Sequence, residues 1–317
     1  MKTTVIIPNY NGIQYLEDCL SSLKGEQAHI IVVDNGSTDG SFEMIGEKFP
    51  TVRTIRFSKN TGFCKAINAG VAVASTQYVI FLNNDTVVEA GFVQALECAM
   101  DADSHIFSAS AKMISMREQG KIDDAGDLYC ALGWAYAIGK GKPEADYTKS
   151  YRIFAACAGA AIYRRSIIQK IGGLDENHFA YLEDIDLGYR ALIYGYRNVF
   201  APDARVYHAG SASSGSRHNA FKVGLASRNS IYLLYKNMPA LQIILNLPTL
   251  AIGFTVKALF FSWKGFGGVY LKGLAKGLKL CASEEGKKNK VRFLPRRLGT
   301  YCRIQAALWA NMIRVCY

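Results

Sequence analysis

Short apolar runs alternate with amphipathic segments along the first hundred residues of the chain. Runs rich in β-branched residues predict strands, and apolar residues three or four positions apart predict helices. The predicted strands have the sequences TTVIIP, HIIVVD, TVRTIRF and QYVIFL. The predicted helices cover 13–23, 41–49 and 62–74. This alternation indicates an α/β fold in which helices cover both faces of a mostly parallel central sheet.

Beyond residue 86 the pattern is less regular. Residues 87–99 have helical periodicity, 105–153 form a glycine-bearing insertion, and the runs ALIYGYRNVF and VYHAG predict short closing strands. Of the 317 residues, 50% are hydrophobic, which is enough to bury a sizeable core. We expect one large domain over 1–237 and an appended helical region over 238–317.

The cysteines and the N-terminus indicate a reducing compartment. The eight cysteines are scattered, without a CxxC pair or a Cys/His cluster at zinc spacing, so the sequence predicts neither a disulfide framework nor a structural metal. The apolar run before Pro8 is too short for the core of a signal peptide. We therefore expect the protein on the cytoplasmic side of the membrane.

Charge is distributed unevenly along the chain. Residues 211–317 hold 17 Lys and Arg against only Glu284 and Glu285, a net charge of +15, whereas residues 1–210 have a net charge of −4. On charge alone, a basic region could bind nucleic acid or an anionic membrane surface. The strongly apolar segment 241–263 lies among these cations. Apolar segments beside Lys and Arg favour the membrane interface over nucleic acid.

Polar residues within 241–263 bear on whether this segment crosses the membrane. A spanning helix needs roughly 20 largely apolar residues, and this run is interrupted by Gln242, Asn246, Pro248 and Lys257. We favour helices that lie on, or insert shallowly into, the cytoplasmic face of the inner or cell membrane. A buried helical hairpin that covers the core is the alternative.

The first candidate site follows the strand HIIVVD. Asp34 ends the strand, and the small residues after it turn the chain. A carboxylate at a strand tip can accept the imide N–H of a uracil or thymine base, and glycine lets the backbone approach a ligand. The alternative is an ordinary turn that caps the next helix.

The second candidate site directly follows the strand QYVIFL. Asn83, Asn84 and Asp85 place a carboxylate beside two amides at a strand end, which suits a divalent cation that bridges two phosphates. Asn and Asp also favour turns, so the tripeptide alone carries little weight. Its position relative to the Asp34 strand strengthens the interpretation.

The third candidate site lies in the run FAYLEDIDLGYR. Glu183, Asp184 and Asp186 crowd three carboxylates before a predicted helix, and crowding raises carboxylate pKa values as a general base requires. Helix capping is the alternative explanation. His208, in VYHAG, could complete a metal site, although a lone histidine is more often structural.

Six segments together carry a resemblance to a known family. They are VIIPNYNG, VVDNGSTDG, NTGFCKAINAG, FLNNDT, the long run from GAAIYRR to LGYRALIYGYR, and VYHAGSAS. In this order and spacing the chain resembles a family 2 glycosyltransferase with the Rossmann-like GT-A fold. Within that family it is most similar to bacterial rhamnosyltransferases of cell-wall and surface polysaccharide assembly. The resemblance covers about 3–237.

The resemblance implies roles for individual residues. Asp184 would be the base and Glu183 would orient the acceptor beside it. Asp85 and His208 would hold Mg²⁺ or Mn²⁺; the NND sequence departs from the DXD pattern and leaves Asp85 as its only acidic ligand. The nucleotide-sugar donor would contact residues from the whole N-terminal half and one from the C-terminal part: Pro8, Tyr10, Asn11, Asp34, Asn60, Gly62, Asn68, Asn83, Asn84 and Arg228.

The predicted function is therefore an inverting transfer of a sugar, L-rhamnose from a dTDP donor, to a lipid-linked or growing glycan. The expected partners are this donor, this acceptor, an anionic membrane surface and a second copy of the chain as a homodimer, but not nucleic acid. Alternatives are a transferase that uses a UDP-sugar and a noncatalytic membrane scaffold. A sugar nucleotidyltransferase is disfavoured because no glycine-rich basic loop follows the first strand, and the missing GxGxxG excludes a dinucleotide oxidoreductase.

Overall fold

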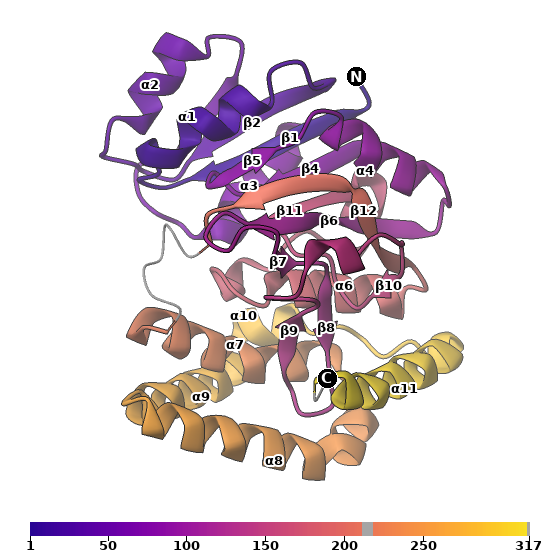
Figure 1. Cartoon of the computed structure of the whole chain (residues 1–317). Helices are drawn as coiled ribbons and strands as arrows, with labels where there is room; N and C mark the ends of the chain where they lie inside the picture. The colour runs from indigo at the N-terminus through magenta and orange to yellow at the C-terminus, as the bar shows by residue number, and fades with distance from the viewer. Residues whose placement is uncertain (211–217, 316–317) are drawn as a thin grey trace.

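A mixed β-sheet organises the N-terminal two thirds of the chain (Figure 1). The computed structural model describes residues 1–210 and 218–315, and within them the sheet has ten strands, with the main order β10-β12-β6-β11-β4-β1-β2-β3. In addition β5 pairs with β12, β7 pairs with β6, and β8 and β9 form a separate hairpin. The strands are β1 Thr3–Asn9, β2 Ala28–Asp34, β3 Arg53–Arg56, β4 Tyr78–Leu82, β5 Thr86–Val88, β6 Ile106–Ser115, β7 Ile122–Asp124, β8 Asp127–Tyr129, β9 Ala135–Ala137, β10 Arg152–Ile153, β11 Ala160–Arg164 and β12 Arg197–His208.

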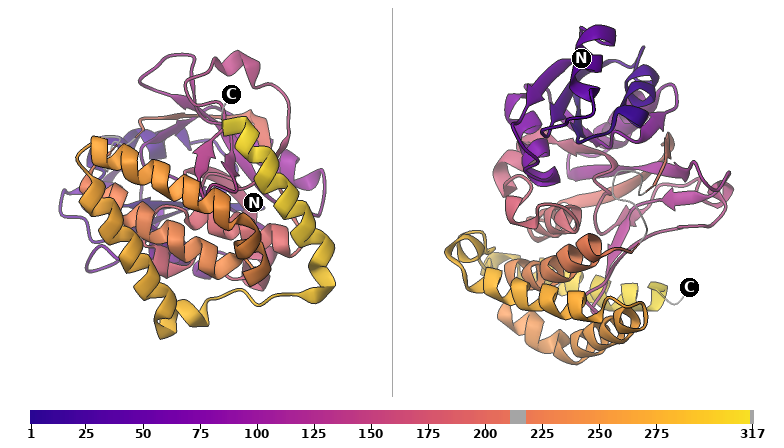
Figure 2. Two further views of the ribbon diagram at one scale, coloured as in Figure 1. Left: turned by 90° about the horizontal axis from the view of Figure 1, so that it is seen from below. Right: turned by 90° about the vertical axis from the view of Figure 1, so that its left-hand side faces the viewer.

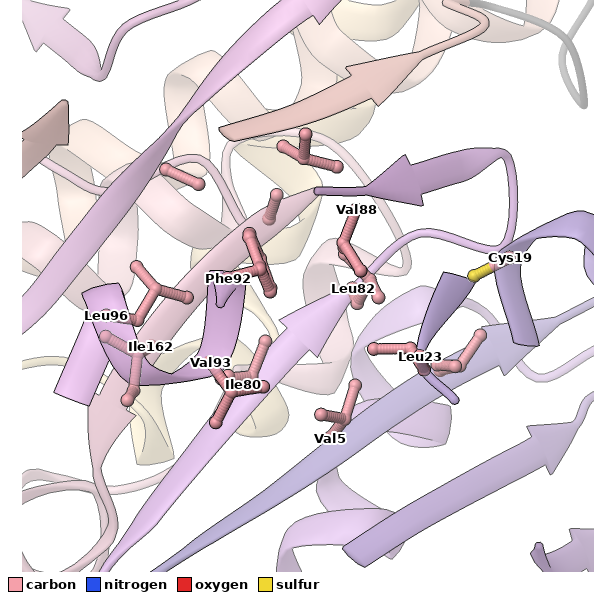
Figure 3. Packing of buried hydrophobic residues seen from close by; sticks show 14 of the residues in the cluster. Val5, Cys19, Leu23, Ile80, Leu82, Val88, Phe92, Val93, Leu96 and Ile162 are labelled. Atoms are coloured by element: carbon pink, nitrogen blue, oxygen red, sulfur yellow. The ribbon is translucent and has the colours of Figure 1, made fainter. Parts of the chain in front are cut away.

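Helices cover both faces of this sheet, as expected. The first six are α1 Ile13–Ser22, α2 Ser41–Lys48, α3 Phe63–Val73, α4 Phe92–Asp101, α5 Arg165–Ile171 and α6 Glu183–Ile193. Helices α1, α2 and α4 share one buried apolar cluster with the sheet, and α3, α5 and α6 share the other. Successive residues of β1 alternate between the two clusters because strand side chains point to opposite faces. Figure 3 shows the first cluster, in which Phe92 and Leu96 lie with Ile80 and Ile162.

The predicted α/β fold is confirmed, with three differences. The sheet is mixed: β3, β2, β1 and β4 are parallel and so are β6 and β12, but β11, which separates the two groups, runs antiparallel to both β4 and β6. The helix expected over 87–99 is a strand, β5, followed by α4, since Thr86–Val88 pairs with β12. The short closing strands are one helix, α6, and the long strand β12.

A layer of helices packs against the part of the chain that contains the sheet and confirms the predicted helical C-terminal segment (Figure 2). Its members are α7 Ala220–Asn237, α8 Ala240–Trp263, α9 Gly267–Ala282, α10 Glu284–Lys288 and α11 Leu298–Val315. A third apolar cluster joins this layer to α6 and to the β8–β9 hairpin, with Tyr189 and Leu308 among its members. The boundary between 237 and 238 stays a prediction.

Helix α8 has an inverted distribution of polar and apolar side chains. Gln242 and Asn246 are buried, whereas Leu241, Leu259 and Trp263 are 75%, 67% and 77% exposed. Only 17% of its most apolar stretch is buried, so a buried hairpin that covers the core is the wrong reading of 241–263. Among the described residues this helix alone is long and apolar enough to cross a bilayer, by length and composition.

Candidate active site

The carboxyl ends of β1 and β2 lie side by side and form one part of the site. Parallel pairing places Asn9 opposite Asp34. The Asn9 side-chain amide donates to Asp34 at 3.2 Å, to Ser37 at 3.2 Å and to Ser41 at 2.8 Å. Its carbonyl accepts from Asn84 at 2.7 Å. Asn9 therefore links the first two predicted sites, although sequence reasoning did not single it out.

Asp34 is fully buried beneath this edge. Besides Asn9, its carboxylate accepts the backbone N–H of Ser37 at 3.2 Å. The Arg56 guanidinium, on a side chain that is 45% exposed, lies 3.8 Å away. A carboxylate has about four acceptor positions, so its two hydrogen bonds leave Asp34 capacity for a further N–H donor. Its contact with a pyrimidine stays a prediction.

Three residues after β1 were predicted to border the nucleotide. Tyr10 is 45% exposed and presents its ring at the surface. Asn11 adopts a left-handed backbone with φ of 50°, and its side-chain carbonyl accepts the N–H of Thr38 at 2.9 Å. Pro8 is half-buried and pairs with Val33 inside the sheet. Tyr10 and Asn11 are thus exposed, whereas Pro8 is held within the sheet.

Asn60 and Gly62 lie in the loop before α3. The Asn60 side chain accepts from Asn35 at 3.1 Å and from the N–H of Gly62 at 2.9 Å. Gly62 has φ of +92°, and a Cβ there would lie 2.6 Å from the Phe179 ring. Glycine is needed here both for the left-handed backbone and for the close approach of the loop that precedes α6.

The other predicted donor residues make contacts inside the protein. Asn68 exchanges two hydrogen bonds with the backbone of Leu174, at 2.8 and 3.0 Å. Asn84 donates to Asn9, and the Arg228 guanidinium donates to the carbonyls of Asn177 and His178. Asn83 is half-buried, and its side chain makes no hydrogen bond within 1–210 and 218–315. The donor roles of these residues stay predictions.

Asp85 and His208 come together at the junction of β5 and β12. Antiparallel pairing places His208 opposite Thr86, the neighbour of Asp85. His208 Nε2 lies 3.3 Å from the Asp85 carboxylate. The strand pairing therefore unites the two residues that were predicted to hold a metal from distant parts of the sequence.

Asp123, on β7, contacts the other face of this pair and was missed by sequence reasoning. Its carboxylate lies 2.7 Å from His208 Nδ1. Burial lowers the pKa of His208, but the hydrogen bonds with Asp123 and Asp85 outweigh it and raise the pKa to about 9. Burial opposes ionisation of Asp123, yet His208 and Lys140 hold its pKa at about 2. The insertion 105–153 has no periodicity that would have revealed this contact.

The donor set at Asp85 and His208 suits a divalent cation. One carboxylate oxygen and one imidazole nitrogen leave several positions of Mg²⁺ or Mn²⁺ for phosphate oxygens and water. A hydrogen bond from Nδ1–H to Asp123 would keep Nε2 directed at the metal, the usual arrangement of a ligating histidine. Because Nε2 must lose its proton to bind metal, cation binding competes with protonation of His208.

Glu183 and Asp184 form the first turn of α6. Burial, followed by the charge of Asp184, raises the pKa of Glu183 to about 8, and one of its oxygens is buried without a hydrogen-bond partner in the described structure. Burial also raises the pKa of Asp184, although N–H groups of Ile185 and Ala158 moderate the effect. Asp184 is less buried than Glu183 and is better placed to meet an acceptor.

Asp186 does not share this raised pKa, and the expectation that crowding raises all three carboxylates was wrong for it. Its side chain points into a buried ionic network with Arg190 at 2.7 Å, Lys236 at 2.9 Å and Asn237 at 2.8 Å. These partners hold the pKa of Asp186 well below its usual range despite burial. Asp186 thus fastens α6 to α7.

Two further carboxylates from the insertion feel the charge of Asp184. Burial raises the pKa of Asp124 to about 7, and the charges of both Asp123 and Asp184 act in the same direction. Burial and the charge of Asp124 raise the pKa of Asp127 well above its usual range. Asp124, Asp127 and Cys157 each place a ligand atom within 4.8 Å of the others. Asp124 feels the charges of Asp184 and of Asp123, and Asp123 in turn contacts His208, so Asp124 lies between the two groups of predicted site residues.

The loop before α6 is strained and tightly held. Phe179, Tyr181 and Leu182 have φ of 62°, 69° and 67°, values that cost free energy in residues other than glycine. The Asn229 side-chain amide, from α7, donates to the carbonyls of His178, Ala180 and Tyr181 at 2.8–2.9 Å. Helix α7 therefore fixes the backbone that delivers Glu183 and Asp184.

Solved structures share this fold at low sequence identity. GalNAc-T7, solved with UDP, GalNAc and Mn²⁺, superposes with a TM-score of 0.62 at 18% identity over 74% of this chain and 48% of that one. TarS 1–349 of S. aureus, solved with UDP-GlcNAc, gives a TM-score of 0.53 at 17% identity over 98% and 84% of the two chains. These similarities show a GT-A glycosyltransferase fold.

Sequence comparison finds relatives with related activities. N-acetylglucosaminyl-diphospho-decaprenol L-rhamnosyltransferase of Mycobacterium tuberculosis is 26% identical over 262 residues, which cover 71% of this chain and 84% of that protein. Pre-mycofactocin glycosyltransferase of the same organism is 26% identical over 65% of this chain and 42% of its own length. The model of glycosyl transferase family 2 matches residues 4–172, more than half of the chain. With this match and with the fold and site above, the chain belongs to glycosyl transferase family 2 and is a glycosyltransferase.

Proposed function

We propose that the protein transfers a sugar from a nucleoside diphosphate donor to a lipid-linked acceptor, with inversion at the anomeric carbon. One observation carries the proposal. We assign Asp85 and His208 to the metal and the half-buried Asp184 to the base, and the loop through Ala158 and Gly159 supports one shared site because it contacts both groups or their neighbours. Gly159 accepts the N–H of Asn83, beside the metal pair, and Ala158 donates to Asp184.

The chemistry follows from the placement of these groups. Asp184 accepts the proton of an acceptor hydroxyl, whose oxygen forms a bond to the anomeric carbon. The bond from that carbon to the phosphate oxygen breaks, and the nucleoside diphosphate leaves with the electron pair. Asp85 and His208 would hold the cation that neutralises the leaving diphosphate. One displacement inverts the anomeric configuration.

For the donor we favour dTDP-L-rhamnose and for the acceptor an N-acetylglucosamine linked to a lipid diphosphate. The name of the mycobacterial relative, which aligns over most of its own length, supports L-rhamnose as the sugar and this acceptor. The UDP-GlcNAc bound to TarS supports the alternative of a UDP-sugar. A thymine methyl group adds only about 1 kcal/mol of burial, so the base alone discriminates weakly.

A transfer assay tests this function. Radiolabelled dTDP-rhamnose and UDP-N-acetylglucosamine are each incubated with a short-chain prenyl diphosphate N-acetylglucosamine, with Mn²⁺ and with a chelator. We expect metal-dependent transfer from dTDP-rhamnose. Transfer only from the UDP-sugar would overturn the donor assignment, and no turnover of either donor would overturn the proposed reaction.

We also place the protein on an anionic membrane surface at the cytoplasmic face. The outward apolar side chains of α8 lie in a region with a net charge of +15. Apolar burial and attraction to anionic lipid add together for a helix in the interface. Because the polar residues of α8 are bonded to the protein, we favour shallow insertion of its apolar face over a membrane span.

A further inference from the structure

A cavity of about 660 Å³ opens between the β8–β9 hairpin, the segment after it and the end of α11. Tyr136, Tyr147 and Tyr151 contribute to its walls. Four cations also line it, and no carboxylate does among the described residues: Lys140, Lys142, Arg152 and Arg314. In Figure 1 the described end of α11 lies beside β8 and β9.

The cations of this cavity are largely uncompensated. Across 1–210 and 218–315, Lys142, Arg152 and Arg314 have no ion pair, in contrast to Arg205, which pairs with Glu89 and Glu144. Like charges that converge on a hollow without an acid repel one another, and an anionic ligand would relieve that repulsion. The chemistry of the cavity fits phosphate oxygens, which accept forked hydrogen bonds from arginine and point-charge contacts from lysine.

The cavity lies between the catalytic site and the apolar helices. On one side Lys140 pairs with Asp123, which contacts His208 of the metal pair at 2.7 Å. On the other side Arg314 shares α11 with Trp309 and Ile313, which are 44% and 65% exposed. Asn311 fastens this helix to the hairpin, donating to Tyr129 and accepting from Tyr136.

This order matches the order of groups in a lipid-linked sugar, which carries a reacting hydroxyl, then a diphosphate, then an apolar chain. We propose that the cavity binds the diphosphate of the acceptor through Arg152, Arg314 and Lys142, and so directs the sugar toward Asp184 and the lipid toward α11. This inference rests on the proposed lipid-linked acceptor. It assigns the insertion 105–153 to recognition of the acceptor.

Paired substitutions test the assignment. Arg152→Gln with Arg314→Gln is compared with Lys149→Gln with Arg303→Gln, a control that removes two cations from the same segments but outside the cavity. With prenyl diphosphate N-acetylglucosamine, each lost charge-assisted contact should raise KM about tenfold. The cavity variant should match the control in three other properties. These are the KM for a neutral alkyl glycoside of the same sugar, the metal-dependent hydrolysis of donor and the melting temperature.

The outcomes separate this inference from the proposed function. If the unaltered protein transfers sugar to the prenyl diphosphate acceptor and the cavity variant has the KM of the control, the cavity assignment is wrong. If the unaltered protein uses no lipid-linked acceptor, the proposed function fails first. An equal rise of KM for both acceptors, or a defect confined to binding of phosphatidylglycerol vesicles, would show that the cations act on something other than the acceptor diphosphate.

Discussion

At the scale of single residues, Asp184 should separate binding from chemistry. Asp184→Asn keeps the shape of the side chain and its bonds from N–H groups but cannot accept the acceptor proton. We expect a loss of transfer of about 10²- to 10⁴-fold with unchanged binding of donor and Mn²⁺, measured by transfer kinetics and calorimetry.

Asp186→Asn, two positions along the same helix, is the matched control. It leaves Arg190 and Lys236 without their shared carboxylate, and breaking a buried pair costs roughly 3–5 kcal/mol of unfolding free energy. We expect a lower melting temperature with catalysis retained in the folded fraction. Near-normal transfer by Asp184→Asn would refute its role as the base.

The metal-free protein should become less stable as pH rises, because His208 loses a proton that stabilises the folded state. The pKa of His208 is raised from 6.5 to about 9, so the folded state binds the proton more tightly than the unfolded state. The resulting stability is fully present below pH 6.5 and is lost as pH rises through about 9. Asp123→Asn should remove on the order of 1–2 kcal/mol of this dependence.

Urea unfolding at several pH values and NMR titration of His208 measure this effect. Glu183 and Asp124, whose pKa values are about 8 and 7, also lose stabilising protons as pH rises, so the comparison is between the variant and the parent protein. A His208 pKa that is unchanged in Asp123→Asn would show that the carboxylate does not hold the proton.

Individual residues differ in how far the sequence could predict them. Asp85, Asp184 and His208 stand in family motifs, and the structure brings Asp85 and His208 together as expected. Asp123 lies in an insertion, and its contact depends on the register of β6 with β7 and β12, which no local pattern encodes. Asp186 differs from its neighbours because Arg190 lies one turn along α6 and α7 supplies a second cation, Lys236, from fifty residues away.

At the scale of elements, α7 acts on chemistry through the loop that it holds. Asn229→Ala removes the donor that three loop carbonyls share, and relaxation of the strained backbone should displace Asp184. We expect the ratio of transfer to donor hydrolysis to fall by about tenfold or more, since hydrolysis needs the metal pair but not an oriented base. This ratio does not depend on the fraction of folded enzyme.

Asn246→Ala provides the control for that experiment. Asn246 is a buried asparagine of α8 that exchanges hydrogen bonds with Gln305, far along the chain from the loop. Loss of its side chain, like that of Asn229, should lower the free energy of unfolding by roughly 1–3 kcal/mol. It should leave the ratio of transfer to donor hydrolysis unchanged. An equal change of ratio in both variants would reduce Asn229 to a general stabilising contact.

Long periodic elements were predictable and short ones were not. Strands β1, β2 and β4 are continuous apolar runs, because helices cover both of their faces. Strands β5, β7, β8 and β9 have three residues each, too few for any period to register, and exist because partners across the sheet or hairpin complete their hydrogen bonds. The short strands of the insertion 105–153 could not be predicted from the sequence for this reason.

At the scale of the whole molecule, the helical layer has two functions with different physical bases. Its inner surface shares the third apolar cluster and the Asp186 network with the catalytic part, so it stabilises the site. Its outer surface presents apolar side chains of α8 among Lys and Arg, which in water is unfavourable unless a partner covers them. A sequence pattern could show the apolar run but not which face of it turned outward.

The outward face should control membrane binding without affecting the chemistry. Each leucine buried in the interface contributes about 1.5–3 kcal/mol, so Leu241→Glu with Leu259→Glu should weaken binding to anionic vesicles by at least about a hundredfold. Val73→Glu, at an exposed apolar residue of α3, is the control. Binding of the parent protein should also weaken as salt concentration rises, since salt screens the net charge of +15 carried by residues 211–317. Because the substituted side chains are exposed on α8 and are not among the predicted site residues, transfer to a short-chain acceptor in detergent should persist. Vesicle sedimentation together with that assay distinguishes loss of anchoring from loss of the enzyme.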